Sequence, residues 1–199
     1  ALGRLAHAHL EDLRAHFGLD VIAMTGSAGK TTTKDLLFQI MSTDAPSVAP
    51  QLSFNNEVGL PLTVLQADET TRHLVLEMGA SGIGHIKYLT DIASPDVAIE
   101  LMVGHAHLGG FGGVDGIEKA KGELITGSRP GAPVVLNYDD PRVMNMTKLS
   151  TGPITTFSPS GKEGADFRAL DVDVDHLGRA HFTLEAPGGR SLVNLNIVG

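Results

Sequence analysis

An apolar stretch that runs directly into a glycine-rich turn constrains this chain more than any other feature. Residues 21–24 are apolar and typical of a strand, residues 25–29 form the turn, and a helical pattern follows over residues 30–42. Glycines let backbone N–H groups converge on phosphate oxygens, and the helix presents the positive end of its dipole to the same anion. This order of elements predicts a nucleotide-phosphate loop, and the alternative is a plain strand-to-helix turn.

Two side chains at the end of the turn have the chemistry that a nucleotide needs. Lys30 can reach the terminal phosphates, and the hydroxyl of Thr31 can ligate the Mg²⁺ that accompanies them. The full pattern G-x-x-x-x-G-K-[ST] would have a glycine where this chain has Met24. The residues predicted to bind the nucleotide are Thr25, Gly26, Ser27, Ala28, Gly29, Lys30, Thr31 and Thr32.

Composition narrows the class of protein. The 199 residues are 42% hydrophobic, which is enough to build the core of one large domain. A net charge of −8 argues against nucleic acid or an anionic membrane as a partner, because binding to either needs clustered Lys and Arg. The sequence has no cysteine and no apolar run as long as a membrane span. We therefore expect a soluble, cytoplasmic protein, and its oligomeric state stays open.

A carboxylate, Glu77, ends the next apolar strand, which is predicted at residues 72–77. An acidic side chain at the carboxyl end of a parallel strand is well placed to hold Mg²⁺, directly or through water. The alternative is a carboxylate that stabilises the N-terminus of a helix at residues 83–89. With a phosphate loop in the same chain, the pattern favours the metal role.

Polar residues in two loops are further candidates. Asn55 and Asn56 can hydrogen-bond phosphate or peptide groups, and the alternative is that they cap a helix at residues 62–66. His105 and His107 follow a predicted strand and could form a transition-metal pair. No cysteine completes a zinc set, so a structural or exposed pair is the alternative.

Two more helices are predicted from hydrophobic spacing. The first covers residues 1–17 and ends at Gly18. The second covers residues 115–125, where Lys119 and Lys121 would ordinarily lie on a solvated face.

The order of the elements predicts the fold class. Up to Asn137 strands and helices alternate, over strands at residues 97–103 and 134–137 among others, which predicts an α/β fold with a mostly parallel sheet flanked by helices. From residue 166 the hydrophobic period becomes two, which predicts a C-terminal antiparallel β meander of three strands. Ligands bind at the carboxyl edge of such sheets, where the loop, Glu77, the histidine pair and Asn137 with Asp139 all fall. Asp140, before Pro141, suits a helix cap.

Five segments carry a resemblance to a known family. They are residues 25–34 (TGSAGKTTTK), 54–63 (FNNEVGLPLT), 77–80 (EMGA), 106–108 (AHL) with 111–112 (FG), and 119–123 (KAKGE). In them the chain resembles the Mur ligases, which build the peptide of the bacterial cell wall. It is most similar to the members that add D-alanyl-D-alanine to a UDP-N-acetylmuramoyl-tripeptide. The match extends from about residue 19 to 140, and the family's loop also lacks the first glycine.

The resemblance implies ATP-dependent amide synthesis. A substrate carboxylate takes the γ-phosphate to give an acyl phosphate and ADP, and the amine of D-alanyl-D-alanine then displaces the phosphate. By the same resemblance, Lys30 and the loop amides hold the β- and γ-phosphates. Thr31 and Glu77 hold one Mg²⁺, and His107 helps to hold a second.

The resemblance also changes the interpretation of Lys121. In this family a lysine at that position is carbamylated and orients the metals, so Lys121 joins Lys30, Glu77 and His107 as a catalytic candidate. Asn55 and Asn56 would lie near the γ-phosphate and the substrate carboxylate. Two residues depart from the family pattern, because Met102 stands where asparagine is usual and His105 where a small residue is usual.

The resemblance predicts a domain division and leaves alternatives open. Residues 1–18 would be a linker helix from a missing N-terminal domain, and residues 19–199 an ATP-binding central domain that is incomplete at its C-terminal end. We expect weak nucleotide binding and no ligation by this piece alone. The alternatives are a Mur-type ligase that adds the third residue, a folylpolyglutamate synthase, a P-loop kinase or GTPase-like switch, and a non-catalytic nucleotide-binding module. The Asn-Lys-x-Asp guanine reader of GTPases does not occur in the sequence.

Overall fold

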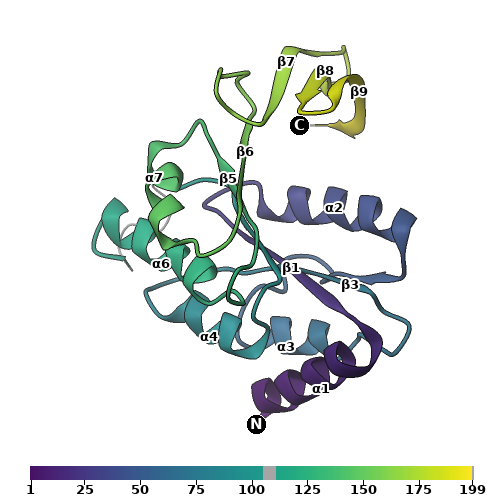
Figure 1. The fold of residues 1–199 in the computed structure, drawn as a ribbon, viewed down its shortest axis with the longest axis vertical. Helices are drawn as coiled ribbons and strands as arrows, with labels where there is room; N and C mark the ends of the chain where they lie inside the picture. Colours follow the sequence, from purple (N-terminus) through teal and green to yellow (C-terminus); the bar gives the residue numbers. More distant parts are fainter. Residues whose placement is uncertain (105–110, 199) are drawn as a thin grey trace.

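A sheet runs through the whole molecule in the computed structural model, which describes residues 1–104 and 111–198 (Figure 1). Its strand order is β2-β3-β1-β4-β5-β6-β7-β8-β9. The strands are β1 Asp20–Thr25, β2 Ser47–Val48, β3 His73–Glu77, β4 Val97–Glu100, β5 Val134–Asn137, β6 Ile154–Ser158, β7 Phe167–Val174, β8 Arg179–Ala186 and β9 Gly189–Val198. Neighbouring strands are parallel as far as β7, and β7, β8 and β9 pair antiparallel. The predicted fold class is confirmed.

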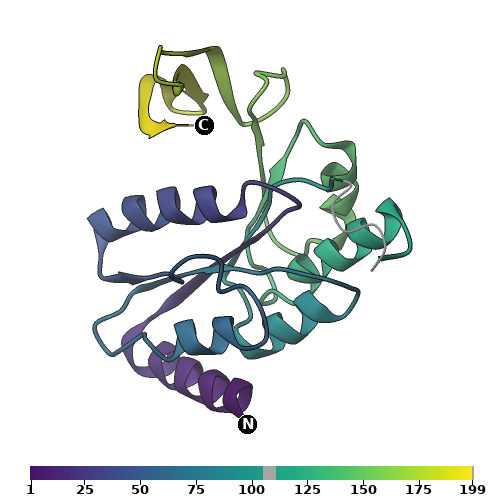
Figure 2. The same ribbon diagram turned by 180° about the vertical axis from the view of Figure 1, so that it is seen from behind.

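Helices cover both faces of the parallel part of the sheet. They are α1 Leu2–Phe17, α2 Lys30–Asp44, α3 Gly59–Val64, α4 His85–Ile92, α6 Val114–Thr126 and α7 Pro141–Met144, with a 3-10 helix η1 at Asn145–Leu149. Figures 1 and 2 show α2 alone on one side of the central strands and α1, α3, α4 and α6 on the other. In the parts of the chain that are described, no helix has both the length and the apolar character needed to cross a membrane.

The helix α1 is packed into the body of the domain. Leu10 and Leu13 belong to the same buried cluster as the central strands. The guanidinium of Arg14 donates to the carbonyl of Ser94 and to the carboxylate of Asp96, at 2.8 Å from the carboxylate oxygen. Gly18 ends the helix in the left-handed region at φ 69°, a conformation that glycine adopts without strain. The predicted helix at residues 1–17 is therefore confirmed.

The antiparallel meander β7–β9 differs from the parallel sheet in how little it buries. Among its described residues no hydrophobic side chain belongs to the buried core, and Val172 and Val174 are more than half exposed. The expected alternation breaks because β7 carries a bulge between Leu170 and Asp173, with Asp171 at φ 52°. An extra residue in one strand shifts every later side chain to the other face. The three-strand meander is confirmed, and its simple period of two is not.

Several boundaries moved from their predicted positions. The strand predicted at residues 97–103 ends at Glu100, and the helix predicted at residues 62–66 begins at Gly59. The strand β6 was not predicted, because its residues Thr155 and Thr156 give it a polar character. The polar side chain of Thr156 is accommodated by Asp166, whose carboxylate accepts from the backbone N–H and the hydroxyl of Thr156, both at 2.8 Å.

Candidate functional site

The glycine-rich turn joins β1 to α2 at the carboxyl edge of the sheet. Gly29 stands immediately before the helix at φ 82°, which lets the chain turn sharply. Position 26 requires a glycine, because a Cβ there would lie 2.8 Å from the Cβ of Leu101. The ammonium of Lys30 donates to the carbonyl of Gly26 at 2.9 Å. The turn is thus a short loop with a cation folded over it.

The loop is also tied to the segment that follows β4. The backbone N–H of Ser27 donates to the carbonyl of Met102 at 2.9 Å, and the N–H of Gly104 donates to the hydroxyl of Ser27 at 2.9 Å. Ala28, Gly29 and Thr32 are exposed at the rim. Thr25 is different, because its hydroxyl is buried and donates to the carbonyl of Met78 at 2.7 Å. The side chain of Thr25 therefore joins β1 to the end of β3.

Glu77 connects the loop to a second segment. It is only 1% exposed, and both of its carboxylate oxygens accept a hydrogen bond. The hydroxyl of Thr31 donates to Oε2 at 2.9 Å, and the side-chain amide of Asn55 donates to Oε1 at 2.6 Å. The parallel pairing of β1 with β3 places Met24 opposite Glu77, which aligns the two strand ends. Three residues that the sequence singled out are therefore in direct contact.

The two asparagines have separate positions. Asn55 faces Glu77, and the backbone N–H of Gly79 donates to the carbonyl of Asn55 at 2.9 Å. Its side chain lies so close that a Cβ at Gly79 would be 2.8 Å from the Asn55 Oδ1. The Oδ1 of Asn56 instead accepts from the backbone N–H groups of Val58 and Gly59, at 3.1 and 2.9 Å. Asn56 thus caps the start of α3, as the structural alternative predicted for the pair.

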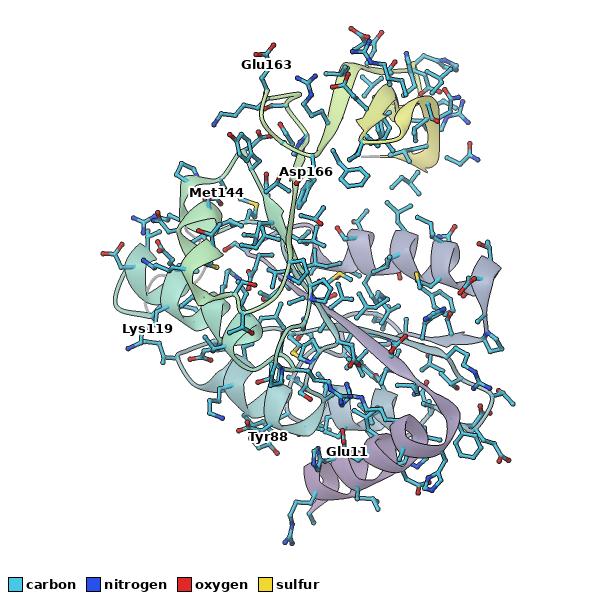
Figure 3. All side chains as sticks on the ribbon, in the orientation of Figure 1. Glu11, Tyr88, Lys119, Met144, Glu163 and Asp166 are labelled. Carbon is cyan, nitrogen blue, oxygen red and sulfur yellow. The ribbon has the colours of Figure 1, made fainter. Side chains whose placement is uncertain are left out.

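Lys121 lies on the inner face of α6. It is 6% exposed, whereas Lys119 is exposed and points outward in Figure 3. The expectation of a solvated face is right for Lys119 and wrong for Lys121. Helical spacing could have separated the two, because Lys121 follows Ile117 by four residues and precedes Leu124 by three, on the buried stripe.

A buried carboxylate, Glu100, interacts with Lys121 and was missed in the sequence analysis. Burial lowers the pKa of Lys121 to about 8, while the charge of Glu100 acts to raise it and that of Lys30 to lower it. Burial raises the pKa of Glu100 well above its usual value, and Lys121 opposes this shift. Within the described residues neither oxygen of Glu100 has a hydrogen-bond partner. Glu100 could have been found from the sequence, because it is an acidic residue in an otherwise apolar predicted strand.

Asn137 at the end of β5 and the two aspartates that follow it bond to neighbouring segments of the chain. Asn137 donates to the carbonyl of Leu101 at 2.8 Å. Burial acts to raise the pKa of Asp139, but hydrogen bonds from Ser158 and Ser160 outweigh it and lower the pKa. Asp140 accepts from the N–H of Arg142 at the start of α7, so the predicted cap is confirmed. The predicted ligands His105 and His107 lie outside the described residues.

A cleft of about 690 Å³ opens beside the loop and is lined by several of the candidates, although Thr31 and Glu77 are not among its lining residues. Lys30, Asn55, Asn56 and Lys121 line it, with Gly26 and Ser27 of the loop. Tyr88, Leu89, Phe111 and Ile117 add an apolar side. A cleft of this size with convergent polar groups is what a small-molecule site requires. Tyr88, in the middle of α4, is about half exposed (Figure 3).

The oxygens of Thr31 and Glu77 form the donor set that suits a hard cation. Among the residues that the structure describes, no group of three or more His, Cys, Asp or Glu side chains could hold a metal. Mg²⁺ needs no such cage, because it retains several waters and binds through one or two protein oxygens together with substrate phosphates. The hydroxyl and carboxylate at 2.9 Å, beside the Lys30 loop, fit that requirement.

Comparison with known proteins gives one consistent answer. The model of the Mur ligase middle domain matches residues 24–199. The chain is 42% identical over its whole length to the UDP-N-acetylmuramoyl-tripeptide--D-alanyl-D-alanine ligase of Mycobacterium tuberculosis, and it covers 38% of that protein.

Solved structures agree with the sequence relatives. MurF from Acinetobacter baumannii superposes with a TM-score of 0.90 at 35% identity, over 100% of this chain and 42% of that one. MurF from Thermotoga maritima, solved in complex with ADP, gives a TM-score of 0.85 at 35% identity, over 97% of this chain and 43% of that one. The chain thus spans about two fifths of the length of the relatives that it matches.

Proposed function

Because the chain belongs to the Mur ligase family through its middle domain, we propose that it binds ATP within a ligase that adds D-alanyl-D-alanine to a UDP-N-acetylmuramoyl-tripeptide. The substrates are those named for its relative in Mycobacterium tuberculosis. The ADP bound to the Thermotoga maritima relative supports ATP as the nucleotide. A bacterial, cytoplasmic location follows from the same proposal.

One observation carries the proposal. Thr31, Glu77 and Asn55 come from three separate segments, yet hydrogen bonds join them at the carboxyl edge of the sheet. Lys30 stands next to Thr31 and donates to the carbonyl of Gly26 in the glycine-rich turn. We assign the phosphates to Lys30 and to the amides of residues 26–31. A nucleotide would exchange the bond from Lys30 to the Gly26 carbonyl for bonds to phosphate oxygens, which are stronger because both partners are charged.

Mg²⁺ would be held by Thr31 and Glu77. When bound, the ion would neutralise the negative charge that develops on the transferred phosphoryl group. Glu77 is suited to this role because burial and two hydrogen bonds hold its carboxylate in one orientation. His107 stays a proposal for a second metal.

Asn55 and Lys121 would orient the acceptor side of the cleft. The amide of Asn55 can donate to the carboxylate of the acceptor as well as to Glu77, because the NH₂ group has two hydrogens. Lys121 has the depressed pKa, about 8, that leaves a usable fraction of neutral amine near pH 7, and only the neutral amine reacts with CO₂. Carbamylation would convert a cation beside Mg²⁺ into a carboxylate-like ligand.

The reaction demands positioning more than covalent chemistry from the protein. The acceptor carboxylate attacks the γ-phosphorus, ADP leaves, and the amine of the dipeptide then attacks the acyl carbon and releases phosphate. Fixing carboxylate and phosphate side by side makes the first step effectively unimolecular. The apolar wall of Tyr88, Leu89 and Phe111 would keep water from the acyl phosphate.

The deciding experiment is phosphate release by a full-length protein that contains this chain, with each candidate carboxylate and amine. We expect release only with UDP-N-acetylmuramoyl-tripeptide together with D-alanyl-D-alanine. A Lys30→Gln variant should lose about 10²-fold or more, because a charged phosphate ligand is removed. Turnover with a single amino acid, or with a folate and glutamate, would instead assign the chain to another ligase of the family.

The isolated chain provides a second measurement. Isothermal titration of residues 1–199 should find weak binding of ATP with Mg²⁺ and no ligated product. Tight binding, or product from this chain alone, would contradict the proposal that the catalytic site needs further parts of the enzyme.

A further inference from the structure

Lys34 is a charged side chain that lies outside the cleft but is fully removed from water. It is 2% exposed on the inner side of α2, one turn after Lys30. Its ammonium donates to the carbonyls of Pro50 and Leu52, at 2.8 and 3.2 Å, and lies 2.7 Å from the carboxylate of Asp35. A buried ammonium is costly unless it is fully paired. The pairing here joins the helix of the phosphate loop to residues 50–52.

The segment that Lys34 holds has an unfavourable backbone. Leu52 lies in the left-handed region at φ 54°, where its Cβ crowds the following carbonyl. A residue with a branched side chain stays in such a conformation only where its surroundings leave no alternative. The ammonium of Lys34 bonds to the carbonyl of Leu52 itself and to that of Pro50 before it. The two bonds thus flank the residue whose backbone lies in the left-handed region.

The turned backbone leads directly into Asn55. The N–H of Asn55 donates to the carbonyl of Ser53 at 2.8 Å, and Phe54 packs against Gly59, where a Cβ would lie 2.7 Å from that of Phe54. Leu52 is 77% exposed and Phe54 44%, so few packing contacts hold this segment, and the path from Leu52 to Asn55 is only three residues long. A change of backbone conformation at Leu52 would move Asn55 relative to Glu77.

We propose that Lys34 is a positioning residue that fixes residues 50–55 so that Asn55 stays in contact with Glu77. It acts on the acceptor side of the cleft from the helix that begins at the nucleotide loop. The structural part of this inference stands on the contacts of Lys34 alone. Its consequence for the acceptor substrate rests on the proposed function.

The structural part is tested by hydrogen exchange on residues 1–199. In Lys34→Met the amides of Asn55 and Gly79, which donate to the carbonyls of Ser53 and Asn55, should exchange about tenfold faster or more, because a local opening becomes easier, while the amides of β1 keep their protection. Lys34→Arg retains donors for both carbonyls and should restore most of the protection. Asp35→Asn is the matched control, since Asp35 is 58% exposed and its loss leaves the bonds to Pro50 and Leu52 intact.

Three exchange results would overturn the inference. The first is unchanged exchange at the amides of Asn55 and Gly79 in Lys34→Met. The second is an equal rise in β1, which would mean a global role in stability. The third applies if Lys34→Met does not fold: a folded Lys34→Arg variant whose Asn55 and Gly79 amides exchange as fast as those of an unstructured peptide would then count against the inference.

The functional part is tested on a full-length ligase that contains this chain. Lys34→Met should raise the KM for the UDP-linked acceptor about tenfold and change the KM for ATP, measured at saturating acceptor, much less, with rescue by Lys34→Arg. A residue that only stabilises the fold would not separate the two KM values. If the Lys34→Met enzyme is active and its KM for the acceptor equals that of the parent enzyme, the positioning role is refuted. Absence of ligation in the parent enzyme would refute the proposed function, while the exchange result would still decide the role of Lys34.

Discussion

Two ionisable side chains of opposite charge, Glu100 and Lys121, are both removed from water near the cleft. Burial shifts the pKa of each towards its neutral form, and their mutual attraction opposes both shifts. A charged carboxylate with no hydrogen-bond partner in the described residues is costly unless a cation compensates it. The protonation state of Lys121, on α6, therefore depends on Glu100, which ends β4.

Replacing Glu100 should change the pKa of Lys121 in a known direction. Glu100→Gln keeps the shape but removes the charge that raises the pKa of Lys121, so this pKa should fall below about 8. The pH dependence of Lys121 labelling by an amine reagent, followed by mass spectrometry, should shift to lower pH. Glu69→Gln, at an exposed site, is the control and should leave the profile unchanged. A shift to higher pH would contradict the assigned coupling.

Capping shows how single contacts on one element support its neighbours. The Asp140 carboxylate accepts from the N–H of Arg142 at 2.9 Å to cap α7, and its other oxygen accepts from the N–H of Val103 at 2.7 Å, in the segment bonded to the glycine-rich turn. One side chain therefore holds both a helix terminus and the segment that follows β4.

Asp140→Ala should lower the free energy of unfolding by about 1–2 kcal/mol or somewhat more, because the cap is lost and the N–H of Val103 is left without its partner. Asp140→Asn keeps one oxygen acceptor and should cost less. Urea unfolding at a fixed pH measures both variants. Equal losses for Ala and Asn would show that charge, not hydrogen bonding, is what Asp140 contributes.

Local pattern explains which elements the sequence could predict. The strand, turn and helix around Lys30 are specified by neighbouring residues, as are the cap at Asp140 and the three strands of the meander. The strand β6 depends on Asp166, and the position of Asn55 depends on Glu77 and Gly79, which are distant in sequence. Glu100 and Lys121 were missed as a pair because their interaction exists only after β4 and α6 have packed together.

At the scale of the whole molecule, α1 belongs to the body of the domain. The interpretation of residues 1–18 as a linker from a preceding domain stays a prediction, but the helix also contributes Ala6, Leu10 and Leu13 to the common core. At the opposite end of the sheet the meander β7–β9 contributes no described residue to that core. The two ends of the chain are therefore integrated to very different degrees (Figure 1).

Leu10→Ala should lower the free energy of unfolding by about 2–5 kcal/mol, because Leu10 is fully buried and its removal leaves a cavity. Leu5→Ala on the same helix is the matched control, since Leu5 is 59% exposed, and it should change stability by less than about 0.5 kcal/mol. Thermal or chemical unfolding of both variants gives the comparison. Similar small effects would mean that α1 is a passive attachment to the domain.

The carboxylate of Glu77 is shared between two neighbours, with Thr31 at the end of the glycine-rich turn on one oxygen and Asn55 on the other. If the proposed nucleotide and acceptor bind on either side of this group, a change in the orientation of Glu77 affects both sites. An orientation that improves one site and the other together makes each substrate strengthen the binding of the other by the same factor, since linkage is reciprocal. Such mutual strengthening would depend on a single carboxylate.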